Sequence, residues 1–138
     1  MSLAHAARSS KTVLFVCEHG SAKSVVAAAH FNRLAAQHGL DARAVSRGTD
    51  PDATLHPAAI TGLAADGLQS GAQPLRLEQN DLDTALRVIT FSELPPSFAA
   101  PADAVVWSVP PVSEDYESSR RAILQKLELL VTDLARRP

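Results

Sequence analysis

Cysteine occurs once among these 138 residues. No disulfide can therefore form within the chain, and a reducing, cytoplasmic location is expected. The net charge is only −2, which provides no basic surface for nucleic acid or for an anionic membrane. No apolar run approaches the roughly 18 residues of a transmembrane helix. The five histidines do not have the spacing of metal ligands, so we expect no metal and no other cofactor.

Hydrophobic residues make up 46% of the chain, which is enough for one ordinary globular domain with a substantial core. Residues 1–11 lack the apolar region of a signal peptide, and we expect a loose N-terminal tail there. Residues 12–138 are then a single domain without internal repeats.

The most informative stretch is residues 12–24, with the sequence TVLFVCEHGSAKS. Residues 12–16 form a short, continuous apolar run, which is typical of a strand buried on both faces of a parallel sheet. Residues from Ala22 onward favour a helix. Cys17 is thus expected where a strand ends and the N-terminus of a helix follows.

This position suits an anion and a reactive thiol. The first turn of a helix has N–H groups without helical partners and the positive end of the helix dipole. The same field, with Lys23 as a nearby cation, favours the thiolate of Cys17 and makes it nucleophilic. Gly20 can adopt a positive φ, so that consecutive N–H groups point inward. Ser21 and Ser24 offer hydroxyl donors.

Strands and helices alternate along the remaining sequence. We expect helices over residues 22–38, 56–65 and 77–84 and a last helix capped by Ser113, and strands over residues 41–46, 85–91 and 104–109. This order predicts a three-layer α/β domain with a four-stranded parallel sheet. Ligands of such sheets bind beyond the carboxyl ends of the strands, where Cys17 and Arg47 both fall.

The segment VLFVC, a small loop, a cation six residues after the cysteine and then serine resembles the phosphate-binding loop of low-molecular-weight protein tyrosine phosphatases and arsenate reductases. The resemblance implies a flavodoxin-like strand order 2-1-3-4 and catalytic roles for Cys17, Lys23 and Ser24. It further implies that phosphate is bound by the loop residues Glu18, His19, Gly20, Ser21 and Ala22.

The chain departs from the family pattern at three positions. Lys23 replaces the family's arginine, and a lysine cannot grip two phosphoryl oxygens as a guanidinium does. Gly20 replaces the usual asparagine of the loop. The family's Asp-Pro dipeptide, whose aspartate protonates the leaving oxygen, is Pro110-Pro111 here. Arg47 is a candidate for the missing guanidinium, and Asp115 for the missing acid.

Three functions remain open at this stage. The first is a phosphatase-like hydrolase of phosphomonoesters that uses Cys17 as its nucleophile. The second is a non-catalytic module that binds phosphate or a phosphorylated protein. The third is an arsenate reductase that depends on an external thiol, because the chain has no second cysteine for an internal relay. All three functions predict phosphate or a similar oxyanion as the ligand. For the hydrolase, the substrate would be a phosphorylated protein or a small phosphate ester.

Overall fold

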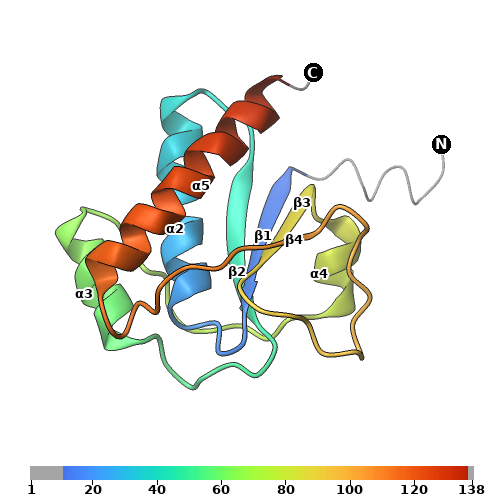
Figure 1. Ribbon diagram of the computed structural model, residues 1–138, viewed down its shortest axis with the longest axis horizontal. Helices are drawn as coiled ribbons and strands as arrows, with labels where there is room; N and C mark the ends of the chain where they lie inside the picture. The colour runs from blue at the N-terminus through green and yellow to red at the C-terminus, as the bar shows by residue number, and fades with distance from the viewer. Residues whose placement is uncertain (1–10, 137–138) are drawn as a thin grey trace.

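The computed structural model describes residues 11–136 and contains a four-stranded parallel sheet with the order β2-β1-β3-β4 (Figure 1). The predicted sheet and strand order are confirmed. Of the predicted tail, residues 1–10 lie outside the described residues. The elements are β1 (Thr12–Cys17), α2 (Lys23–Gln37), β2 (Arg43–Gly48), α3 (Pro57–Ala65), α4 (Gln79–Thr84), β3 (Arg87–Thr90), β4 (Val105–Val106) and α5 (Tyr116–Arg136).

β1 lies in the centre of the sheet and is covered on both faces, as its continuous apolar sequence predicts. Val13 and Phe15 pack with α2, α3 and α5 in the larger core. Leu14 and Val16 point to the opposite face and pack near α4 in a smaller core. Side chains alternate along a strand, so Cys17 points to the same face as Phe15 and contacts the larger core at its edge. The strand therefore directs its last side chain toward α2.

Several predicted boundaries differ from the structure. The second strand, expected over residues 41–46, is Arg43–Gly48 and so includes Arg47. The fourth strand is only Val105–Val106, although residues 104–109 have the composition of a longer strand. Both valines are exposed on the edge of the sheet, and the chain leaves the sheet soon after Trp107 donates to the carbonyl of Thr90. Ser113 does not cap the last helix, which begins at Tyr116. Within residues 11–136 no helix is both long and apolar enough to cross a bilayer.

A polar cluster joins α2, the end of α3 and α5. The Tyr116 hydroxyl and the Arg120 Nε donate to Asp66 Oδ2, at 2.7 and 3.1 Å. His30 Nε2 lies 3.4 Å from the same carboxylate oxygen and 3.3 Å from the Tyr116 hydroxyl. Burial of His30, which is only 3% exposed, lowers the pKa of its imidazole despite the favourable charge of Asp66. The three helices are thus held by a group that resists protonation.

This cluster predicts a loss of stability in mild acid. Because the folded-state pKa of His30 is lowered, the unfolded chain binds more protons as the pH falls through about 6.5, the usual histidine value. The contribution of neutral His30 to the free energy of unfolding is complete above that pH and decreases as the pH falls below it. We expect the urea midpoint of the wild type to fall between pH 7.5 and 5.5, and that of His30→Gln to fall less. An equal fall in the two proteins would contradict this prediction.

Candidate active site

The loop of residues 18–22 connects the carboxyl end of β1 to the first residue of α2. Cys17 is the last residue of the strand and Lys23 the first of a helix of 15 residues. Gly20 has φ 60°, which a residue with a side chain rarely adopts. The first helical hydrogen bond runs from the Val26 N–H to the Ala22 carbonyl. As predicted, the strand therefore ends at Cys17 and a helix follows after a short loop.

The carbonyl groups of this loop point outward and are bound by the segment that follows β2. The N–H groups of Thr49, Asp50, Asp52 and His56 donate, respectively, to the carbonyls of Cys17, Glu18, His19 and Ser21 at 3.2, 2.7, 3.0 and 3.0 Å. The N–H groups of residues 18–22 donate no backbone hydrogen bond within the part of the chain that the structure describes. With its carbonyls bound from outside, the loop is left with N–H groups available for an anion.

Two glycines set the position of the loop against β2. A Cβ atom on Gly48 would lie 2.7 Å from the Gly20 nitrogen, and one on Gly20 would lie 2.8 Å from the Gly48 nitrogen. Gly48 is the last residue of β2 and pairs with Cys17. The backbones of loop and strand can approach this closely only because neither residue has a side chain.

Cys17 ends a chain of hydrogen bonds that comes from the neighbouring strand. The Ser46 hydroxyl donates to the Ser24 hydroxyl at 2.7 Å, and Ser24 Oγ lies 2.9 Å from Cys17 Sγ. Because Ser24 accepts from Ser46, its own proton is free to be donated to the sulfur. Ser24 is fully buried, so this donor is not shared with water. Ser46 was not predicted as a site residue; the sequence gives only its place near the end of the second strand.

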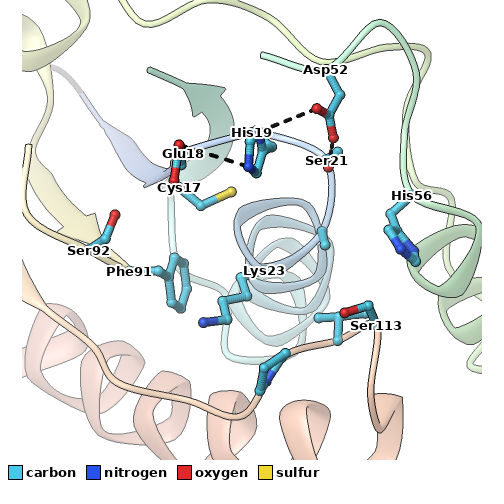
Figure 2. Close-up of a pocket in the computed structure, with 13 residues that line it drawn as sticks. Cys17, Glu18, His19, Ser21, Lys23, Asp52, His56, Phe91, Ser92 and Ser113 are labelled. Atoms are coloured by element: carbon cyan, nitrogen blue, oxygen red, sulfur yellow. Dashed lines mark hydrogen bonds and ion pairs between the residues drawn. The ribbon is translucent and has the colours of Figure 1, made fainter. Parts of the chain in front are cut away.

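A cavity of about 310 Å³ opens over the loop. Figure 2 shows the Cys17 sulfur and the Lys23 side chain directed into it. Glu18, His19, Ser21 and Ala22 of the loop also line the cavity, whereas Gly20 does not. The opposite walls come from segments far away in the sequence: Asp52, His56, Phe91, Ser92, Pro111, Val112 and Ser113. A thiol and a cation thus face one space of about 310 Å³, beside a loop whose N–H groups donate no backbone hydrogen bond to the described residues.

The sequence profile of the low molecular weight phosphotyrosine protein phosphatases matches residues 12–94. The chain belongs to this family. The match covers β1, the Cys17 loop and the first two parallel strand connections, and it ends before β4. A search of curated protein sequences gives no match.

Solved structures show the same fold along most of the chain. A mutant of YwlE from Bacillus subtilis has a TM-score of 0.80 and 19% identity, over 92% of this chain and 100% of that chain. The low molecular weight protein tyrosine phosphatase from T. tengcongensis has a TM-score of 0.68 and 23% identity, over 91% and 98%. An arsenate reductase in its phosphate binding state has a TM-score of 0.74 and 23% identity, over 90% and 98%. Phosphatases and arsenate reductases therefore share this architecture.

Arg47 does not reach the phosphatase-like cavity. Its Nε lies 3.5 Å from Asp81 Oδ2 on α4, and an Arg47 N–H donates to the Ser46 carbonyl at 2.8 Å. Ser46 points toward α2, so the next side chain along the strand points to the opposite face of the sheet. Among the described residues that line the cavity, Lys23 is the one lysine or arginine. The structure thus brings together the predicted loop residues but not the predicted guanidinium.

Asp115 also lies apart from the cavity. It accepts hydrogen bonds from the Ser118 N–H at 3.3 Å and from the Ser118 hydroxyl at 2.6 Å, as the residue that caps a helix beginning at Tyr116 does. These two bonds hold the pKa of its carboxyl below the usual value. An ionised capping carboxylate cannot protonate a leaving group. Pro111, by contrast, lies in the cavity wall, where the family's acid is absent.

Charged and polar side chains surround the mouth of the cavity. His19 Nδ1 lies 3.3 Å from Asp52 Oδ1, and His19 Nε2 lies 3.9 Å from Glu18 Oε2. Glu18, His19 and Asp50 bring their ligand atoms within 4.8 Å of one another, but all three are exposed, and such clusters alone do not define a metal site. Asp52 and His56 were not predicted as site residues. The backbone bonds of the segment after β2 bring both residues to the loop, and the Asp52 carboxylate also accepts the Ser21 hydroxyl at 2.8 Å.

Proposed function

We propose that this chain hydrolyses phosphomonoesters, with Cys17 as the nucleophile and the loop N–H groups as the site of the phosphoryl oxygens. The observation that carries the proposal is the Cys17 sulfur in the cavity, 2.9 Å from a buried serine hydroxyl at the N-terminus of α2. Binding of phosphate alone needs the N–H groups and a cation, but it needs no thiol. A thiolate supported by hydrogen bonding is the feature that hydrolysis requires.

Each residue of the site has a separate role in the proposed reaction. Cys17 attacks phosphorus, while the N–H groups of residues 18–22 and the Lys23 ammonium stabilise the charge on the equatorial oxygens. Ser24 stabilises the thiolate before attack and again when it leaves the phosphocysteine. Ser46 positions Ser24 through the 2.7 Å hydrogen bond. Water then attacks phosphorus, and phosphate departs as the thiolate is restored.

The cation offers the first test. Lys23 is a compact charge, whereas an arginine at this position can donate two parallel hydrogen bonds. We expect Lys23→Arg to raise kcat/KM for an activated aryl phosphate by about tenfold, the equivalent of one charge-assisted hydrogen bond. Hydrolysis is followed by release of 4-nitrophenol, with inorganic phosphate as competitive inhibitor.

Lys23→Met is the matched control, because it keeps the length of the side chain and removes its charge. It should lower kcat/KM by about 100-fold, which is typical for loss of one group that stabilises an oxyanion. Equal activity of the wild type, Lys23→Arg and Lys23→Met would show that this cation does not hold the phosphoryl group.

Two other activities are compatible with the same loop. The absence of an acid at Pro110-Pro111 favours a module that binds phosphate or a phosphorylated protein without turnover. The position of the single cysteine in the cavity also suits attack on arsenate, followed by reduction through an external thiol. Wild-type protein that binds phosphate but hydrolyses no aryl phosphate would favour the first. Arsenite formation only in the presence of glutathione would favour the second.

A further inference from the structure

Six titratable side chains line the cavity within the described part of the chain: Cys17, Glu18, His19, Lys23, Asp52 and His56. A phosphomonoester with a poor leaving group needs one of them as a proton donor, because the family's aspartate is absent. We infer that His19, positioned by Asp52, is the general acid of this site. The inference rests on the proposed hydrolysis and deepens it.

Four of the six side chains are excluded by their charge or their part in the reaction. Cys17 is the nucleophile, and Lys23 is needed as a cation for the equatorial oxygens. Asp52 accepts the Ser21 hydroxyl at 2.8 Å and faces the His19 ring, so it serves as the acceptor that positions this ring. Glu18 Oε2 lies 3.9 Å from His19 Nε2, so its carboxylate faces the histidine ring. The choice is therefore between the two histidines.

His56 is engaged by the helix that it caps. Its Nδ1 accepts the Ala58 N–H at 3.0 Å, at the N-terminus of α3. A second proton would have to go onto this nitrogen and would break the cap. Service of His56 as a doubly protonated donor would therefore cost α3 its cap.

His19 is held in the opposite way. Its Nδ1 faces Asp52 Oδ1 at 3.3 Å, and Asp52 is itself fixed by Ser21. Its Nε2 lies 3.9 Å from Glu18 Oε2, beyond hydrogen-bond distance, so the Nε2 proton remains available for an oxygen of the substrate. Asp50, also close to this ring, adds a third carboxylate beside it. Figure 2 shows the His19 ring between the Glu18 and Asp52 side chains.

The proton and the electrons balance over two steps. In the first, the Cys17 sulfur forms a bond to phosphorus and the bond from phosphorus to the leaving oxygen breaks. The leaving oxygen takes the electron pair of that bond and the Nε2 proton of His19, and departs as an alcohol or phenol. In the second, neutral His19 takes a proton from the attacking water, the sulfur–phosphorus bond breaks, and phosphate and the thiolate are released.

Two substrates that differ in their leaving group separate this role from a structural one. Phenyl phosphate needs a proton donor, whereas 4-nitrophenyl phosphate needs little acid assistance. We expect His19→Gln to lower kcat/KM for phenyl phosphate by about 100-fold or more and for 4-nitrophenyl phosphate by less than tenfold. Asp52→Asn should show the same selectivity with a smaller effect. His38→Gln, exposed at the far end of α2, should change neither rate.

Each other outcome has a distinct meaning. If His19→Gln slows both substrates equally or neither, His19 is not the acid, while the proposed hydrolysis stands on the activated ester. The same holds if the wild type hydrolyses only the activated ester. If the wild type hydrolyses neither, the proposed function itself fails, and the inference fails with it. Inhibition by inorganic phosphate, measured in every active variant, shows that the loop is intact.

Discussion

Cys17→Ser is expected to lower the hydrolysis of 4-nitrophenyl phosphate by at least about a thousandfold. The thiolate is a strong nucleophile that needs no base at the moment of attack, whereas a serine hydroxyl must lose its proton first. The groups fixed near this position do not supply a base: Ser24 Oγ, 2.9 Å from the sulfur, is a neutral hydroxyl, and His56 Nδ1 already accepts the Ala58 N–H. The initial rate of 4-nitrophenol release measures the effect.

Binding of inorganic phosphate serves as the control for this variant. The N–H groups of residues 18–22 and the Lys23 side chain are unchanged by the substitution, so the dissociation constant for phosphate should stay within a few-fold of the wild-type value. Calorimetric titration gives this constant. A serine variant that retains more than a tenth of the wild-type rate would mean that another group attacks phosphorus.

Gly48→Ala is expected to lower kcat/KM for the same ester by about 100-fold, although residue 48 does not line the cavity. The added Cβ would lie 2.7 Å from the Gly20 nitrogen and 2.9 Å from its Cα. Both are backbone atoms, so the loop must move away from β2 by several tenths of an ångström. The loop N–H groups and the Cys17 sulfur would then no longer be positioned to contact the same phosphoryl group. Steady-state kinetics with a check of thermal unfolding measures the change.

Gly39→Ala is the matched control for this substitution. Gly39 has φ 64° and no neighbouring atom within 4 Å of an added Cβ, so alanine there costs stability without moving the loop. We expect a lower unfolding temperature and unchanged kcat/KM for Gly39→Ala. If Gly48→Ala is as active as Gly39→Ala, the close approach of the two backbones does not set the site.

The sequence was sufficient to locate the Cys17 loop because local chemistry determines its structure. A buried strand, a flexible glycine and a helix start within 13 residues leave few arrangements, and the structure has the predicted one. Fold and strand order also follow from alternating elements and the family resemblance. The side chains that β2 directs toward the site could not be predicted, because they depend on the register of the strand. A shift of one residue along β2 decides whether Ser46 or Arg47 faces α2.

The ends of elements and the side chains of distant segments were equally hard to predict. Ser113 and Asp115 are both good capping residues, and only the course of the chain after Pro111 decides that α5 starts after Asp115. Asp52 and His56 belong to a loop whose composition indicates no function. They line the cavity because N–H groups of the segment after β2 donate to the carbonyls of the Cys17 loop. No local sequence pattern predicts this contact.

Exchange of ¹⁸O between labelled inorganic phosphate and water tests most directly whether Cys17 attacks phosphorus. Formation of phosphocysteine from bound phosphate expels water, and its hydrolysis brings in an oxygen atom from the solvent, so no ester is needed. Mass spectrometry of the phosphate follows the label. We predict progressive loss of ¹⁸O with the wild type and none with Cys17→Ser. Phosphate that binds to the wild type but keeps its label, or an equal loss in both proteins, would contradict the role of Cys17 as the nucleophile.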